Sequence, residues 1–119
     1  MLRAKALPPI LQQATSNGVK SSIIVTTTGE LLASAGTDTN EKLVGAIAMN
    51  VWTTYHKTSE DVNCLLIECE EGRLGIRKVG DFLVCVYGDS TVQFGILKAK
   101  VDSLNQYLDE PLQQLSSIN

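Results

Sequence analysis

A continuous apolar run covers residues 82–87, directly after the turn residues Gly80-Asp81, and it limits the possible folds more than any other segment. A strand with one wet face alternates apolar and polar residues, so an unbroken run predicts a strand that is covered on both faces. The shorter run at residues 65–67, Leu-Leu-Ile, has the same character. We therefore expect a central sheet with helices packed on both of its sides.

Turn residues and hydrophobic periodicity divide the rest of the chain into further elements. The predicted order is helix, two strands, helix, three strands, helix. Proline removes a backbone donor, so Pro111 is expected to end or kink the last helix. The predicted helices cover residues 8–15, 40–57 and 92–109, and the predicted strands cover residues 19–27, 30–35, 63–70, 73–79 and 82–87.

Length and composition predict a single domain that spans residues 1–119. The chain is 44% apolar and 19% charged, which is typical of a globular domain with its own core. The net charge is −3, without the basic face that phosphate binding requires, so we expect no nucleic-acid partner. The longest apolar run is far shorter than the roughly 20 residues of a membrane-spanning helix. Any membrane association is therefore expected to be indirect, through a partner.

Residues that carry chemistry are scarce. Neither a phosphate-binding loop nor a dinucleotide fingerprint is present, and His56 is the sole histidine, which excludes a site with two histidine ligands. The three cysteines lie in apolar runs without a Cys-x-x-Cys pair, as expected of packed, reduced thiols. We predict no catalytic residue, cofactor or metal. The alternative is a small thiol enzyme that pairs Cys69 or Cys85 with His56.

The middle helix carries more apolar surface than one sheet face covers. At about 100° per residue, one arc is expected to pack on the sheet and to leave an adjoining flank for a loop or a second chain. Trp52 is the sole tryptophan and lies on this flank, and tryptophan is enriched where binding energy concentrates. The expected sheet-facing arc comprises Leu43, Val44, Ile47, Val51 and Tyr55, and the expected flank comprises Gly45, Ala48, Met49 and Trp52.

The strand predicted at residues 63–70 adjoins this flank, and as an edge strand it would pair with an edge of the partner. The alternative is that Trp52 caps the core of its own chain. The candidate partner interface therefore comprises Gly45, Ala48, Met49, Trp52, His56, Cys64 and Leu66.

Several short segments, in order, resemble the roadblock/dynein light chain family, and within it the adaptor subunits of Ragulator complexes on late endosomes and lysosomes. The resemblance spans both termini and the middle of the chain. The segments are Met1-Leu2-Arg3 with Lys5-Ala6-Leu7, Asn50-Val51-Trp52, Glu71-Gly72-Arg73, Gly95-Ile96-Leu97-Lys98-Ala99-Lys100 and Tyr107-Leu108-Asp109-Glu110-Pro111-Leu112.

The resemblance implies a three-layer α/β fold: a five-stranded antiparallel sheet with the first and last helices on one face and the middle helix on the other. It implies a non-catalytic scaffold that heterodimerises with a second roadblock-fold subunit, the MEK-binding partner. Further implied partners are a lipidated membrane-anchor subunit and Rag GTPases, in TOR kinase and MAP kinase signalling at the cytoplasmic face of late endosomes or lysosomes. In isolation, a homodimer is the corresponding expectation. The alternative within this fold is a dynein-associated light chain that carries cargo.

Overall fold

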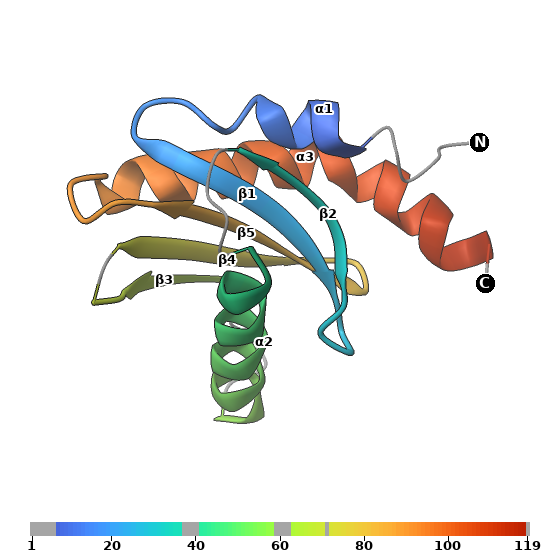
Figure 1. Cartoon of the computed structure of the whole chain (residues 1–119). Coiled ribbons are helices and arrows are strands. Elements are labelled where there is room, and N and C mark those ends of the chain that lie inside the picture. The colour runs from blue at the N-terminus through green and yellow to red at the C-terminus, as the bar shows by residue number, and fades with distance from the viewer. Residues whose placement is uncertain (1–6, 37–40, 59–62, 71, 119) are drawn as a thin grey trace.

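The computed structural model describes residues 7–36, 41–58, 63–70 and 72–118 and shows three layers (Figure 1). The predicted order of elements is confirmed. The helices are α1 (Leu7–Gln12), α2 (Glu41–Thr58) and α3 (Phe94–Ile118), and the strands are β1 (Val19–Thr26), β2 (Leu31–Gly36), β3 (Cys64–Glu68), β4 (Arg73–Val79) and β5 (Phe82–Gly88).

The five strands form one sheet in the order β2-β1-β5-β4-β3, and every neighbouring pair is antiparallel. The long apolar strand β5 lies at the centre, and β2 and β3 lie at the edges. Helices α1 and α3 cover one face of the sheet, and α2 lies on the opposite side (Figure 1). The predicted fold class is therefore confirmed.

Two hydrophobic cores explain why β5 is apolar along its whole length. Its side chains alternate between the faces, so that Val84 and Val86 enter the core under α1 and α3, and Leu83 and Cys85 enter the core under α2. The first core also holds Leu11, Ile24, Leu97, Val101, Leu104 and Leu108. The second core also holds Ile23, Val25, Val44, Ala48, Trp52, Leu74 and Ile76.

The last helix extends beyond its predicted end. Helix α3 continues through Pro111 to Ile118, so of the two expectations for Pro111, an end or a kink, the end of the helix is wrong. Proline removes one backbone hydrogen bond, but Leu108 and Leu112 on either side of it are fully buried in the first core. Burial of two leucines contributes more free energy than one lost hydrogen bond, which is why tertiary packing overrides the local signal.

The first helix is shorter than predicted, because it ends at Gln12 instead of residue 15. Beyond Gln12 the chain forms a series of turns, in which the Thr15 hydroxyl donates to the Gln12 carbonyl at 2.8 Å. Asn17 then adopts a φ of 59° and Gly18 a φ of 92°, a left-handed conformation that a helix cannot contain. Asn17-Gly18 therefore forms the turn into β1, and the helix itself ends earlier.

Candidate functional site

Helix α2 packs on the sheet with the flank that was expected to be left for a loop or a second chain. Ala48 is fully buried, and Trp52 is only 7% exposed beneath the helix, in the core that includes Ile23 of β1 and Cys85 of β5. The expectation that the Trp52 side of the helix is left uncovered is therefore wrong. The apolar arc is as wide as predicted, but the sheet covers the half that contains Gly45, Ala48 and Trp52. The small residues Gly45 and Ala48 let the helix approach the sheet closely on this side.

Gly45 shows this close approach directly. A Cβ atom at this position would lie 3.0 Å from Cγ1 of Val25 and 3.5 Å from Cδ1 of Ile23. The missing side chain therefore lets the first turns of α2 lie against β1. Met49, one turn further along, is half-buried and packs against the same core. Gly45, Ala48 and Trp52 thus act first as core residues of this chain.

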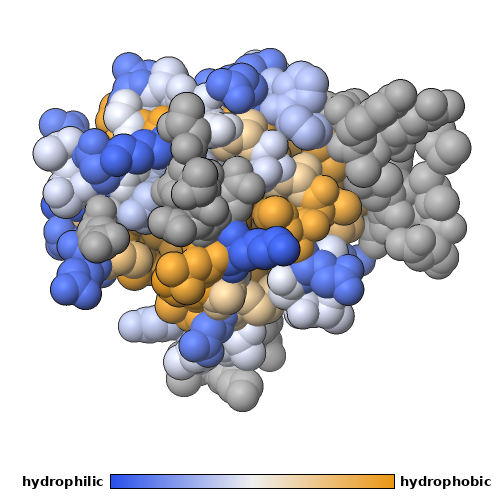
Figure 2. Space-filling view, viewed as in Figure 1, coloured by the Kyte–Doolittle hydropathy of each residue, from blue (hydrophilic) through white to orange (hydrophobic). Residues whose placement is uncertain are grey.

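The opposite half of the apolar arc lies in solvent. Leu43 is 60% exposed, Ile47 is 37% exposed, and Tyr55 is 54% exposed. Ile47 follows Leu43 by four residues and Tyr55 follows Ile47 by eight, so all three lie along one side of α2 and form one strip, which we call the α2 apolar strip. Figure 2 shows a hydrophobic area beside the first turns of α2, on the side where β3 and β4 lie in Figure 1. From the sequence, these residues were expected in the arc but against the sheet.

Strand β3 is an open edge of the sheet, as expected, because among the described residues only β4 pairs with it. Its side chains alternate between the two faces. Leu65 and Ile67 pack toward the α2 core, whereas Leu66 faces α3, since Leu66 and Leu97 both approach Gly75. Leu66 is 39% exposed. Cys64 lies on the same face as Leu66 and is half-buried against the first core.

The residues predicted as one interface are therefore divided between two faces of the sheet. Gly45, Ala48, Met49 and Trp52 lie on α2, while Cys64 and Leu66 lie on the α3 side of β3. The physical reason is that successive side chains of a strand point to opposite faces of the sheet. In β3, Leu65 and Ile67 face α2, so Cys64 and Leu66 face α3. The backbone of His56 belongs to α2, and its side chain lies outside the described residues. A partner role for this set stays a prediction.

A polar network lies beside β3 on the α3 side. Asp102 of α3 accepts from Arg77 of β4 at 3.1 Å and from Lys98 at 2.6 Å. The hydrogen bond to Asp102 and its negative charge raise the pKa of Lys98. This network fixes α3 to β4 and presents mixed charge beside the open edge of the sheet. The Lys98–Asp102 pair is exposed and the Arg77–Asp102 pair is partly buried, and exposed pairs contribute more to orientation and partner choice than to stability.

The thiols lack the environment of a nucleophile. Burial raises the pKa of Cys85 and of Cys69, and burial followed by the nearby Asp102 charge raises the pKa of Cys64. A catalytic thiolate requires the opposite shift, so these surroundings argue against the thiol-enzyme alternative. Within the described ranges, histidine, cysteine and acidic side chains form no cluster of three or more that would suit a metal ion. None of the helices there has the length and apolarity that crossing a bilayer requires.

A five-stranded antiparallel sheet between one helix and two helices, with an open strand and an apolar helix strip at one side, defines a roadblock-type domain. The chain belongs to the Roadblock/LC7 domain family, whose model matches residues 10–87. Among individual proteins it is similar to the Ragulator complex protein LAMTOR2 homolog of Caenorhabditis elegans, with 28% identity over 120 residues. That match covers 98% of this chain and 97% of the relative.

Solved structures confirm the fold. Myxococcus xanthus MglB is 15% identical with a TM-score of 0.80, and the match covers 97% of this chain and 95% of that chain. A Roadblock/LC7 domain from Streptomyces avermitilis is 13% identical with a TM-score of 0.78, covering 89% of this chain and 97% of that chain. At this level of identity, the likeness concerns the fold alone.

Proposed function

We propose that the chain is a non-catalytic adaptor subunit that heterodimerises with a second roadblock-fold subunit in a Ragulator-type complex. The observation that carries this proposal is the α2 apolar strip of Leu43, Ile47 and Tyr55, together with the open edge of β3. Large apolar side chains in one strip on a single helix are costly in water and are typical of a surface that another protein covers. The similarity to a protein named for the Ragulator complex supports the particular assembly.

The proposed interface uses two kinds of contact. A helix of the partner packs against the α2 apolar strip, and a partner strand adds to β3, which extends the sheet across two chains. The strand contact supplies backbone hydrogen bonds, and the helix contact supplies apolar burial. Leu66 lies at the middle of the open strand and is 39% exposed, so the partner also covers it on the α3 side.

The same edge also suits a homodimer when the partner is absent. If two copies of β3 pair in antiparallel fashion about Leu66, Leu65 lies opposite Ile67 of the second copy, and Cys64 lies opposite Glu68. No like charges then face each other in the paired strands. We propose that the isolated chain self-associates weakly through this edge and exchanges into the heterodimer when the partner is present.

The wider assembly follows from the family resemblance. The proposed partners are the MEK-binding roadblock-fold subunit, a lipidated membrane-anchor subunit and Rag GTPases, and the proposed processes are TOR kinase and MAP kinase signalling. The proposed location is the cytoplasmic face of late endosomes or lysosomes. Attachment there is peripheral and occurs through the lipidated partner.

Co-expression with the MEK-binding roadblock-fold subunit tests the heterodimer. We expect the two chains to co-purify at a 1:1 ratio by size-exclusion chromatography with light scattering. Ile47→Asp is expected to abolish this peak, because it places a charge in the apolar interface. Thr53→Asp is a matched control, since Thr53 is exposed on another side of the same helix. A heterodimer that forms equally well with Ile47→Asp contradicts the proposed interface.

A further inference from the structure

The second edge of the sheet, β2, lacks the usual protection of an edge strand. Among the described residues only β1 pairs with it, so its outer side is open. Natural proteins block open edges with charged residues or proline, because unpaired backbone groups bind other strands. The six residues of β2 include no charged residue and no proline. An edge of this kind suits the addition of a further strand.

The hydrogen bonds of the β1–β2 turn show which backbone groups of β2 face outward. The Thr26 N–H donates to the Glu30 carbonyl at 2.9 Å, so Thr26 directs its backbone groups toward β2. Direction alternates along a strand, so Ile24 also faces β2 and forms the hydrogen-bonded pair with Ala33. The next residue, Ser34, therefore points its N–H and C=O to the open side. An added strand would form its backbone hydrogen bonds with this N–H and C=O.

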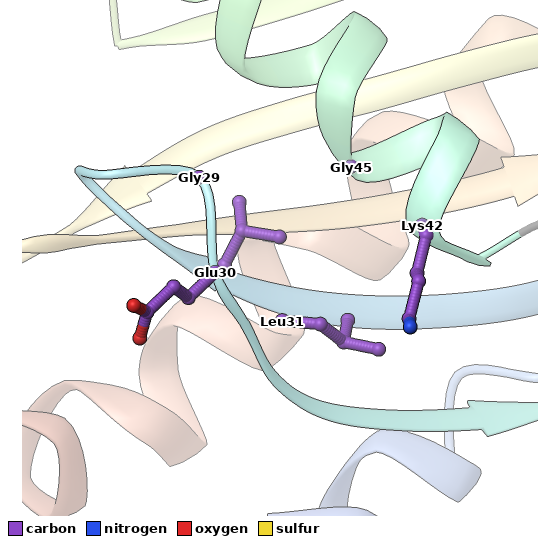
Figure 3. Close-up of a pocket in the computed structure, with 6 residues that line it drawn as sticks. Gly29, Glu30, Leu31, Lys42 and Gly45 are labelled. Atoms are coloured by element: carbon purple, nitrogen blue, oxygen red, sulfur yellow. The ribbon is translucent and has the colours of Figure 1, made fainter.

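A groove of about 400 Å³ lies beside this edge, between the β1–β2 turn and the first turns of α2 (Figure 3). Val25 and Leu31 form its apolar wall, and the absent side chain of Gly45 leaves it open toward the helix. Lys42 reaches from α2 toward Leu31, whereas Glu30 points away from Lys42 (Figure 3). Lys42 has no carboxylate partner in the part of the chain that the structure describes.

The position of the groove fits the register of the edge. Leu31 pairs with Val25 and Ser34 pairs with Ile23, and both of these partners on β1 enter the core on the α2 side of the sheet. Residues that pair directly share a face, so Leu31 and Ser34 also face the α2 side. The side chains of an added strand on that face would therefore lie between β2 and Lys42. Figure 2 shows hydrophobic surface in this region, over β1 and β2.

We propose that the outer edge of β2 and this groove bind an extended acidic segment of a partner protein, which adds as a sixth strand. The segment hydrogen-bonds to the backbone of Ser34, seats one apolar side chain against Val25 and Leu31, and places a carboxylate at the Lys42 ammonium. Each requirement comes from a separate observation: among the described residues, the outer backbone groups of β2 pair with no strand, an apolar groove lies beside them, and Lys42 has no carboxylate partner. This surface lies at the opposite edge of the sheet from β3, so it remains available in the proposed heterodimer.

The test uses synthetic ten-residue peptides that alternate valine and threonine and carry one aspartate, compared with the same peptides carrying lysine instead. Binding to the full chain is measured by fluorescence anisotropy. Ser34→Pro removes only the outward N–H, and proline is tolerated at such a position on an edge strand, so β1–β2 pairing is retained. Ser34→Ala retains the N–H and is the matched control. Lys42→Glu reverses the charge, with Lys78→Glu on β4 as its control.

We expect aspartate peptides to bind at least tenfold more tightly than lysine peptides. Ser34→Pro and Lys42→Glu should each weaken binding at least tenfold, and the two control variants should not. Absence of binding to the wild-type chain, or binding that both test variants retain, overturns the proposal. The proposal is also overturned if only substitutions in the α2 apolar strip weaken peptide binding. Ser34→Pro should leave the heterodimer with the roadblock-fold subunit intact, so the two proposals fail independently.

Discussion

Removal of the two exposed aliphatic side chains of the α2 apolar strip should weaken partner binding while the chain stays folded. The perturbation is the double variant Leu43→Ser/Ile47→Ser. Both residues lie on the solvent side of α2, but the parts of their side chains that are not exposed pack on their own chain, so truncation of both lowers the free energy of unfolding by about 1.5–3 kcal/mol. The melting temperature of the isolated chain is therefore expected to fall by less than in Trp52→Ala, and the chain stays folded.

The magnitude follows from the surface that remains for a partner to cover. Complete burial of a leucine or isoleucine contributes about 1.5–3 kcal/mol. Leu43 is 60% exposed and Ile47 is 37% exposed, so coverage by the partner is worth about 1–2 kcal/mol for Leu43 and about 0.6–1 kcal/mol for Ile47. Together these contributions correspond to an increase in Kd of roughly 10- to 100-fold.

The assay is isothermal titration calorimetry of each variant against the purified roadblock-fold partner, with melting curves of the unbound chain. Trp52→Ala is the comparison variant, because Trp52 is 7% exposed within its own core. It should lower the free energy of unfolding by about 3–5 kcal/mol. An unchanged Kd for the double variant refutes the interface. A Trp52→Ala chain with normal stability but impaired partner binding refutes the burial argument and restores Trp52 as a contact residue.

Three further predictions concern the remainder of the chain. Gly36→Ala should abolish stable β1–β2 pairing, because Gly36 has a φ of 118° and its new Cβ would lie 2.1 Å from the Lys20 carbonyl oxygen; normal urea unfolding would contradict this. The Thr91 hydroxyl and amide lower the pKa of Asp89. That contribution is present above the pKa of the unfolded carboxyl and is lost as the pH falls through the lower folded value. Thr91→Val should thus flatten the acid limb of the stability curve, and an unaltered acid limb would exclude the effect. Native-state alkylation, followed by mass spectrometry, should leave the buried thiol unmodified until the chain unfolds. It should modify the two half-buried thiols more slowly than free cysteine. Rapid reaction of any of the three would revive the thiol-enzyme alternative. The unmodified thiol is Cys85, and the slow ones are Cys64 and Cys69.

The architecture was predictable because its signals are local or periodic. The unbroken apolar run of β5 required cover on both faces, and the two cores on either side of Leu83 and Val84 satisfy this requirement. Turn residues placed the strand ends within a few positions. Element lengths were less predictable where packing dominates, as in α3, which passes Pro111 because Leu112 is fully buried. A local signal such as one proline does not show how much free energy the same segment gains from contacts with distant parts of the chain.

The candidate site was predictable in extent but not in orientation. The width of the apolar arc on α2 shows from the sequence that one sheet face is insufficient to cover it. The sequence contains no measure of which half lies closer to the sheet, and Trp52 fits either position by residue type. The structure decides this because Gly45 and Ala48 let the helix approach β1 on their side. Leu43 and Ile47 are left in solvent as a consequence.

Hydrophobic periodicity and turn chemistry are properties of short segments, so the sequence was sufficient to specify the strands, the helices and the need for cover on both sides of the sheet. Three other features depend on which segments lie side by side: the open edges of the sheet, the side of α2 that packs on it, and the outward direction of the Ser34 backbone N–H and C=O. Those relations arise from packing between residues far apart in the chain. The surfaces that are left for partners therefore depend on tertiary packing and not on any local segment.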